Sequence, residues 1–414
     1  MGGVSMEWKE VTLGDLCEIS SSKRIFAKEY QSDGVPFYRG KEIIAKQKGN
    51  AISNELFISR NRYEEIKARY GVPQQRELLL TSVGTLGVPY VIKEEEFYFK
   101  DGNLTWFRHF NGLDVEYLYY WFLSPYGKNE INTKAIGSTQ KALTIDSLSK
   151  FDIKIPVNLD DQRRIASILS SLDRKIELNN KINADLEEMA QAIFKSWFVD
   201  FEPFKDGKFV DSELGMIPEG WKVGRLDEIA DVVGGSTPSK AKPEYYTQKG
   251  IAWLTPKDLS NHPAVYTSRG EIDITKEGYN STSTKLMPKG TILFTSRAPI
   301  GYISIAQNDI CTNQGFKSLV PKKAGTCFLY CFLKYVTPEI ENKSTGSTFK
   351  EASGSLMKSL KVIMPEQKVF EDFETIVSPL FARIESLEKE SSRLSLLRDT
   401  LLPRLMSGEL EVPE

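Results

Sequence analysis

Two short stretches combine hydroxyl side chains, a glycine and a lysine. "GSTQK" occupies residues 137–141 and "GSTFK" occupies residues 346–350. Glycine lets the backbone approach a ligand, hydroxyl and main-chain N–H groups donate hydrogen bonds, and lysine adds a positive charge, which together suit a phosphate. The same stretches are also compatible with helix-capping turns that touch no ligand. The sequence therefore predicts two candidate phosphate contacts and leaves the capping alternative open.

Further basic and amide side chains stand in other predicted loops. "SSSKR" at 20–24 and "GGSTPSK" at 234–240 each follow a predicted strand, and "YGVPQQRE" at 70–77 sets two glutamines beside an arginine. Amide and guanidinium groups pair with base edges in DNA, although plain surface loops and solvated charges explain these residues equally well. The candidate DNA contacts are Lys23, Arg24, Gln74, Gln75, Arg76, Ser138, Thr139, Gln140, Lys141, Ser236, Thr237, Ser239, Lys240, Arg297, Ser347, Thr348 and Lys350.

Signatures of common enzyme classes are missing from the sequence. There is no P-loop, no Gly-x-Gly-x-x-Gly after a strand, no Pro-Pro pair of an amino-methyltransferase motif and no Pro-Asp start of a nuclease motif. The two histidines have no evident nucleophile beside them, and the four cysteines form no Cys-x-x-Cys pair. We therefore expect no catalytic residue, no metal and no cofactor in this chain, and buried, reduced cysteines.

The chain is an imperfect tandem repeat. Trp8-Lys9 recurs as Trp221-Lys222, "LTSVGTLGVPYVI" at 80–92 recurs as "FTSRAPIGYISI" at 294–305, and the two Gly-Ser-Thr stretches follow in the same order. In the second of these matches Arg297 replaces a valine, a difference expected of two modules that read different bases. Each half mixes short alternating strands with turn residues and one helical stretch, which predicts two similar α+β modules.

A long amphipathic helix is predicted at the end of each half. The first runs over 161–198 without glycine or proline; the second is expected to begin near Ser378-Pro379 and to stop at Gly408. Helices of this length need more than one small domain to cover their apolar stripes, so an antiparallel coiled coil with pseudo-twofold symmetry is predicted, the alternative being two unrelated core helices. Three asparagines at 179, 180 and 183 interrupt the stripe and would set register. The predicted seam comprises Ile168, Leu172, Ile176, Ile182, Leu186, Met189, Ile193, Leu380, Ile384, Leu387, Leu394 and Leu401.

Charge and hydropathy set outer limits on function. The net charge is −2, and it divides into +1 for residues 1–157, −2 for 158–205, +4 for 206–365 and −5 for 366–414. The two modules are thus neutral to mildly basic, which permits DNA binding without proving it. No stretch approaches the ~20 apolar residues of a membrane span. We expect a cytoplasmic protein without membrane contact.

Taken together, the repeat and the helices resemble the specificity subunit of type I restriction–modification enzymes. The resemblance rests on the Trp-Lys start, the Gly-Ser-Thr-x-Lys stretch and the acidic-Gln helix opening of each half, and covers about 8–407. The stretches "DQRRIASILSSLDRKIELNNKINADLEEMAQAIFKSWFVDFEPF" at 161–204 and "LRDTLLPRLMSGEL" at 397–410 resemble the central and C-terminal spacer helices of that family. The family resemblance implies five segments: a first target-recognition domain (1–158), a central spacer helix (159–199), a linker (200–220), a second target-recognition domain (221–366) and a C-terminal spacer helix and tail (367–414).

The resemblance also implies partners and a role. Each target-recognition domain would read one half of a split, asymmetric sequence in double-stranded DNA, and the helices would act as a ruler that binds two methyltransferase subunits. Those subunits would use S-adenosylmethionine to methylate adenine, and restriction/translocase subunits would use ATP and Mg²⁺; this chain would be non-catalytic. Trp197, Phe198, Leu401 and Leu402 at the helix ends would hold the helices to the modules or receive the methyltransferase. The alternatives are a coiled-coil scaffold with two protein-binding modules and no DNA role, or an enzyme with unrecognised chemistry.

Overall fold

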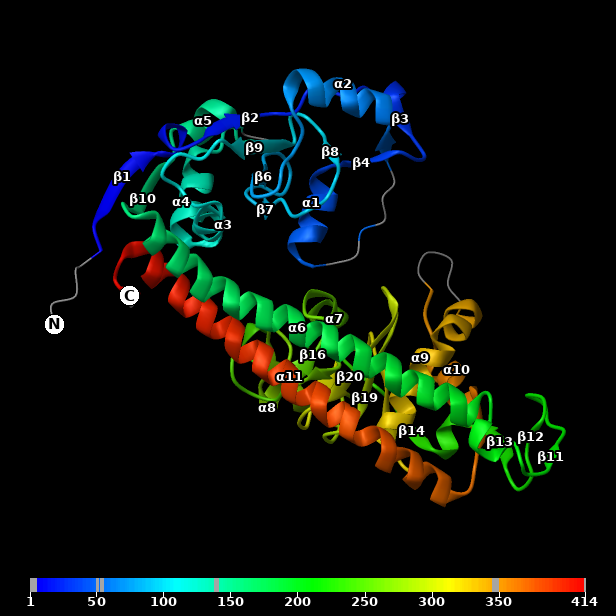
Figure 1. Cartoon of the computed structure of the whole chain (residues 1–414). Coiled ribbons are helices and arrows are strands. Elements are labelled where there is room, and N and C mark those ends of the chain that lie inside the picture. The colour runs from blue at the N-terminus through cyan, green and yellow to red at the C-terminus, as the bar shows by residue number, and fades with distance from the viewer. Residues whose placement is uncertain (1–5, 50–51, 53–55, 138–140, 345–349, 413–414) are drawn as a thin grey trace, which may run out of the picture. The chain divides into compact units, whose positions relative to one another are not determined.

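The computed structural model of the chain describes residues 6–49, 52, 56–137, 141–344 and 350–412 (Figure 1). It divides into two compact units. Unit 1 comprises Met1–Glu177 with Ser392–Glu414, and unit 2 comprises Leu178–Ser391. Each unit therefore holds one half of the sequence repeat together with a portion of both long helices.

Unit 1 is built on two four-stranded sheets and one strand pair. The central sheet has the order β2 (Glu18–Ser20), β9 (Leu104–Arg108), β6 (Leu78–Thr81), β7 (Pro89–Val91). The second sheet has the order β3 (Tyr30–Gln31), β5 (Phe57–Ile58), β4 (Val35–Tyr38), β8 (Tyr98–Phe99), and β1 (Trp8–Thr12) pairs with β10 (Asp152–Pro156). The short helices are α1 (Gly40–Gln47), α2 (Arg60–Tyr70), α3 (Val115–Leu123), α4 (Pro125–Lys134) and α5 (Ile145–Ser149).

Unit 2 repeats this plan with small additions. Its central sheet has the order β14 (Ala230–Gly234), β22 (Lys317–Pro321), β19 (Ile292–Ser296), β20 (Ile300–Ala306), β17 (Tyr266–Thr267). The remaining strand pairs are β13 (Lys222–Arg225) with β23 (Lys361–Met364), β16 (Trp253–Leu254) with β21 (Cys311–Thr312), β15 (Tyr246–Thr247) with β18 (Asp273–Ile274), and β11 (Phe209–Val210) with β12 (Ile217–Pro218). Its short helices are α7 (Pro256–Asn261), α8 (Lys276–Asn280), α9 (Thr326–Lys343) and α10 (Gly354–Ser359).

The predicted repeat is confirmed at the level of hydrogen bonds. The strand orders β2-β9-β6-β7 and β14-β22-β19-β20 correspond one to one. Lys9 opposes Ile155 in the terminal strand pair of unit 1, and Lys222 opposes Met364 at the equivalent register of unit 2. The hydroxyls of Thr81 and Thr295 each donate to the carbonyl four residues ahead, at 2.5 and 2.9 Å. One local sequence plan thus folds twice into the same α+β module.

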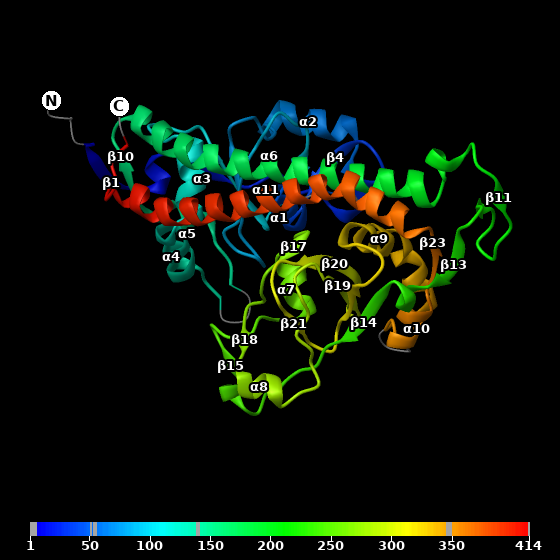
Figure 2. The same cartoon turned by 90° about the horizontal axis from the view of Figure 1, so that it is seen from below.

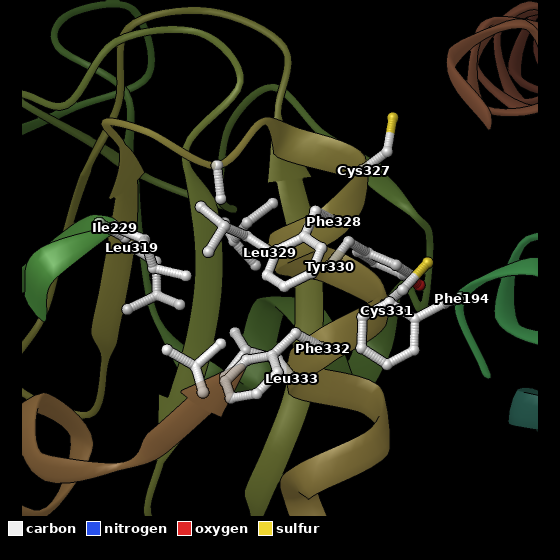
Figure 3. Packing of buried hydrophobic residues seen from close by; sticks show 14 of the residues in the cluster. Phe194, Ile229, Leu319, Cys327, Phe328, Leu329, Tyr330, Cys331, Phe332 and Leu333 are labelled. Carbon is white, nitrogen blue, oxygen red and sulfur yellow. The ribbon is translucent and has the colours of Figure 1, made fainter. Parts of the chain in front are cut away.

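Helix α9 shows why the core of unit 2 forms where it does. Its first two turns are apolar on almost every side, and the seven residues at 327–333 are all buried. Figure 3 shows Phe328 and Leu329 of α9 between Ile229 and Leu319 on one side and Phe194 of the long helix on the other. All four cysteines are buried free thiols, as expected, and burial raises the pKa of Cys17 and Cys311 to about 12.

The two long helices are α6 (Leu159–Phe198) and α11 (Gln367–Ser407). The first matches its predicted extent. The predicted start of the second at Ser378-Pro379 is wrong, because α11 begins eleven residues earlier. An interior proline costs about 3 kcal/mol, but Phe370, Phe373 and Val377 continue the apolar face before it and are all buried. Burial of three such side chains offsets that cost.

Within each unit the helices lie antiparallel, in agreement with Figures 1 and 2. In unit 1, Arg398 of α11 bonds Asp173 of α6 at 2.6 Å. In unit 2, Asn179 donates to Glu390 at 2.9 Å, and Phe198 stacks on Phe370 with ring centroids 6.3 Å apart. Residue numbers along α6 thus rise while those of their partners on α11 fall, which is the antiparallel pairing that the coiled-coil prediction requires.

The buried face of the helices differs in part from the predicted seam. Met189 is 52% exposed and lies outside it, because Ala190, one residue on, points inward instead. Asn179 and Asn183 are buried in the seam, whereas Asn180 is exposed, so two of the three asparagines occupy register-setting positions. Ile384 and Leu387 are buried as predicted. The other predicted seam residues are half-buried: Ile168, Leu172, Ile176, Ile182, Leu186, Ile193, Leu380, Leu394 and Leu401.

The aromatic and leucine residues at the helix ends hold the helices to the modules. Phe198 is buried in the core of unit 2, and Trp197 packs beside it. Leu402 is buried in the core of unit 1, with Leu401 packed against it. Of the two roles predicted for these four residues, the structure supports attachment to the module. Over the described part of the chain, no helix combines the length and the apolar character that crossing a bilayer requires.

Candidate nucleic-acid interface

The loop that follows β2 in unit 1 carries Lys23 and Arg24, and it is pinned to the sheet beneath. The Ser22 hydroxyl donates to the Phe99 carbonyl at 2.8 Å, and the Lys23 N–H donates to the Tyr98 hydroxyl at 2.7 Å. Both side chains at 23 and 24 are exposed. Hydrogen bonds therefore hold the backbone of this loop in place, and the loop exposes two cationic side chains.

One of these two cations is held by an ion pair. The Arg24 guanidinium donates to the Asp101 carboxylate at 2.7 Å, and this bond raises the pKa of Arg24. Lys23 has its ammonium 5.1 Å from the centre of the Tyr70 ring. The Arg24 side chain remains 66% exposed, so its guanidinium keeps N–H donors beyond the one that Asp101 accepts.

The equivalent loop after β14 in unit 2 is pinned by different partners. The Ser236 N–H donates to the Thr312 carbonyl at 2.9 Å, and the Trp253 indole N–H donates to the Ser236 carbonyl at 3.1 Å. The Thr237 hydroxyl bonds the Gln314 side chain. Ser236 and Thr237 are thus turned partly inward by their bonds, while Ser239 and Lys240 are exposed.

The turn between β6 and β7, and the equivalent turn between β19 and β20, each pair with the residue that directly follows a Gly-Ser-Thr-x-Lys segment in the sequence. Val83 bridges to Ala142 in unit 1, and Arg297 bridges to Glu351 at the same place in unit 2. The lysines of both segments are exposed. Ser138, Thr139, Gln140, Ser347 and Thr348 lie outside the described residues, so their role as contacts stays a prediction.

Unit 2 carries more positive charge at this place than unit 1. The Arg297 guanidinium lies 3.7 Å from the Glu351 carboxylate, and the Lys317 ammonium lies 3.4 Å from its other oxygen. The Lys350 ammonium donates to the Glu341 carbonyl at 3.3 Å. Two cations, Arg297 and Lys317, thus flank the Glu351 carboxylate, whereas unit 1 has the apolar Val83 at the position of Arg297. This asymmetry fits two modules that share a fold and differ in what they contact.

The loop before β6 exposes three candidate contacts, Gln74, Gln75 and Arg76, but two of them form hydrogen bonds within the module. Arg76 donates to Asp114 at 3.0 Å, and Asp114 is the N-cap of α3. The Gln74 amide donates to the Val72 carbonyl at 3.0 Å. Of the three residues, Gln75 alone has neither a hydrogen bond nor an ion pair among the described residues.

Sequence reasoning missed the partners that pin the two loops. Asp101 holds Arg24, and Gln314 holds Thr237. Thr237 and Gln314 each lie 213 residues after Arg24 and Asp101, which is the offset of the repeat. The ion pair of the first module therefore stands where the second module has a neutral hydrogen bond. Alignment of the two halves matches these positions with each other, but the contact within each pair is visible only in the structure.

Among the described residues, no cluster of three histidine, cysteine or acidic side chains could hold a metal. The structure has two similar modules with exposed polar and basic loops, and two long antiparallel helices. Each half of the chain thus presents a comparable set of exposed polar and basic loops.

Comparison with known proteins places this design in a family. The model of the type I restriction modification DNA specificity domain matches residues 6–188 and again residues 218–394. The chain therefore belongs to the type I restriction–modification DNA specificity family, with one copy of the domain in each half.

Relatives agree with this assignment. The chain is 40% identical over 190 residues to the type I restriction enzyme MjaIX specificity subunit of Methanocaldococcus jannaschii, a match that spans 45% of this chain and 44% of that one. It is 28% identical over 329 residues to the HindI specificity subunit of Haemophilus influenzae, spanning 65% and 71%. The first of these matches thus covers less than half the length of the relative.

A solved structure shares the fold. The S subunit of a type I restriction–modification system from M. genitalium superposes with a TM-score of 0.60 at 19% identity, over 97% of each chain. The likeness extends over both modules and both helices, which supports the α+β, helix-linked architecture.

Proposed function

We propose that this chain is the DNA sequence-specificity subunit of a type I restriction–modification complex. Each module reads one half of a split, asymmetric target in double-stranded DNA, and the chain itself performs no chemistry. The observation that carries the proposal is the duplication: the DNA specificity domain matches both halves, and both halves fold to the same strand order.

The partners supply what this chain lacks. Two methyltransferase subunits would bind S-adenosylmethionine and methylate one adenine in each half-site, and restriction/translocase subunits would use ATP and Mg²⁺. The chain's net charge of −2 supports a division of labour in which the partners provide much of the clamp on DNA phosphates. The isolated chain should therefore bind DNA weakly and lose it steeply as salt rises.

The decisive experiment is co-expression with the adjacent adenine methyltransferase, followed by mapping of methylated adenines across the host genome. A new bipartite motif, two short specified blocks separated by a fixed gap, supports the proposal and reads out both modules at once. A stable complex that creates no motif would contradict it.

Charge reversal separates DNA recognition from a scaffold role. We expect Lys141→Glu with Lys350→Glu to reduce DNA affinity at least tenfold, because two exposed cations become anions at the candidate phosphate contacts. Lys205→Glu, in the 200–220 linker segment that precedes the second module, is the control and should leave affinity unchanged. A scaffold that does not touch DNA would show no response to either change.

The ruler role can be tested by a matched deletion. Removing seven facing residues from each of α6 and α11 preserves their antiparallel register and shortens the helices by about 10 Å, or about three base pairs of DNA. We expect the spacer of the methylated motif to shorten by about three base pairs with both half-sites unchanged. An unchanged spacer in a folded complex would refute the ruler.

A further inference from the structure

The loop after β2 ends in an aromatic ring that has no cover. Phe26 is 56% exposed and follows directly on Lys23, Arg24 and Ile25. Single exposed apolar residues are common on protein surfaces, so exposure alone says little. What distinguishes Phe26 is the way in which the chain on both sides of it is held.

The backbone around Phe26 is fixed on both sides. Before it, Ile25 is buried in the module and Arg24 is tied to Asp101 at 2.7 Å. At the residue itself, the Phe26 N–H donates to the Glu29 carboxylate at 2.8 Å. The backbone that carries the ring is therefore fixed before any ligand arrives, which lowers the entropy cost of binding at this loop.

The residues just before Phe26 present two exposed cations, and the carboxylate that pairs with one of them is more buried than its partner. The Arg24 side chain is 66% exposed, but its partner Asp101 is only 17% exposed. Lys23 is exposed, and it lies over Tyr70, a second exposed ring. The loop therefore carries two exposed cations and an exposed ring within four consecutive residues, a combination that suits the phosphates and the apolar parts of base edges in double-stranded DNA.

The second module provides an internal comparison. At the repeat offset of 213 residues, Phe26 corresponds to Ser239, which is also exposed. The pinned loop is present in both modules, since Thr237 bonds Gln314 where Arg24 bonds Asp101. The ring is thus not needed to form the loop, and it distinguishes the first module from the second.

We propose that Phe26 is a specificity-determining residue of the first module, which places its ring against the bases of the DNA half-site that this module reads. The inference rests on the proposed function and adds to it a residue, a module and a mode of contact. Lys23 and Arg24 hold the flanking phosphates, the fixed loop aims the ring, and the apolar contact with the bases excludes water from them.

The test uses the full chain in complex with its methyltransferase subunits. Phe26→Ser transplants the residue of the second module, Phe26→Leu keeps an apolar side chain, and Tyr126→Ser removes a 45% exposed ring on α4 of the same module as a control. The dissociation constant is measured on the mapped target, and base preference is measured on libraries randomised in one half-site at a time.

We expect Phe26→Ser to weaken target binding about 10- to 100-fold and to relax base preference in one half-site only. Phe26→Leu should lie between the wild type and Phe26→Ser, and Tyr126→Ser should match the wild type. Because Phe26 is exposed, thermal unfolding of all three variants should match the wild type.

Three results would overturn the inference. Unchanged affinity and preference in Phe26→Ser would remove Phe26 from the DNA interface. Weaker assembly with the methyltransferase, with unchanged base preference in the complex that forms, would place the ring at a protein interface instead. A wild-type complex that shows no sequence preference in either half-site would overturn the proposed function itself, and this inference with it.

Discussion

Gln162 ties the first turn of α6 to the module of unit 1, and its removal should loosen that unit selectively. The side chain is fully buried. Its carbonyl accepts the Asp114 N–H at 2.8 Å, and its amide donates to the Gly112 and Pro156 carbonyls at 3.0 and 2.8 Å. Gln162→Leu removes all three bonds and leaves the Asp114 N–H buried without an acceptor.

The expected cost follows from these contacts. Three net hydrogen bonds at about 1 kcal/mol each give a loss of about 3 kcal/mol in the free energy of unfolding, with the leucine recovering part of it by burial. The repeat supplies a matched control. Gln367, at the equivalent first turn of α11, is exposed and makes one bond to the Lys323 carbonyl, at 3.2 Å. Gln367→Leu should therefore cost about 0.5 kcal/mol or less.

Native-state hydrogen exchange read by mass spectrometry can separate the two units. We expect Gln162→Leu to lower the protection of peptides around Asp114 and in β10 by about 100-fold, the equivalent of about 2.7 kcal/mol, with unit 2 peptides unchanged. Wild-type protection in Gln162→Leu, or an equal loss in Gln367→Leu, would refute the assignment of Gln162 as the tie.

Three further predictions test other parts of the structure. Burial raises the pKa of Glu388 from its usual 4.5 to about 7 although the carboxylate accepts two backbone N–H groups; the folded state therefore prefers the protonated form, and stability is lost as pH rises from about 4.5 through 7. As the pH rises from 4.5 to 8, the free energy of unfolding of Glu388→Gln should increase relative to that of the wild type by up to about 3 kcal/mol, as measured by thermal unfolding. A difference that does not change with pH would contradict the buried position of the Glu388 carboxyl. Asp173→Ala should cost about 2 kcal/mol in chemical denaturation, because it removes the acceptor 2.6 Å from the Tyr120 hydroxyl; in a Tyr120→Phe background the cost should fall, and simple additivity would argue against the bond. Gly235→Ala should displace the loop after β14, since a Cβ there would collide with two backbone carbonyl oxygens, whereas Gly234→Ala, with open space at its Cβ, should be silent in amide NMR spectra and in melting temperature; equal effects of both changes would count against the packing described.

Local pattern was enough to predict the repeat, the module class and the two helices. Period-two and period-3.6 spacing of apolar residues depends on the chain itself, and a duplicated pattern reports a duplicated fold whatever the partners of each residue are. The first long helix, free of glycine and proline, was therefore predicted to within two residues. The start of the second long helix was predicted too late in the sequence, because Ser378-Pro379 is typical of a helix N-terminus. Only the burial of Phe370, Phe373 and Val377 shows that packing outweighs the cost of the interior proline.

The candidate interface could be predicted only as a set of loops. Which residues in a loop face solvent depends on partners far along the chain: Arg24 meets Asp101 across 77 residues, and Arg76 meets Asp114 across 38. Likewise, Asn179 became a buried seam residue because Glu390 and Ser391 of α11 stand opposite it, 211 and 212 residues away. No local period records such pairings.

The sequence by itself therefore determined the duplication, the helix-linked design and the family, because these depend on order and spacing along the chain. Tertiary structure decided which cations are tied down, which asparagines set the helix register, and that Phe26 stands uncovered on a pinned loop. The physical reason is that hydrogen bonds, ion pairs and burial are made between residues that folding brings together, and their energies depend on three-dimensional position alone.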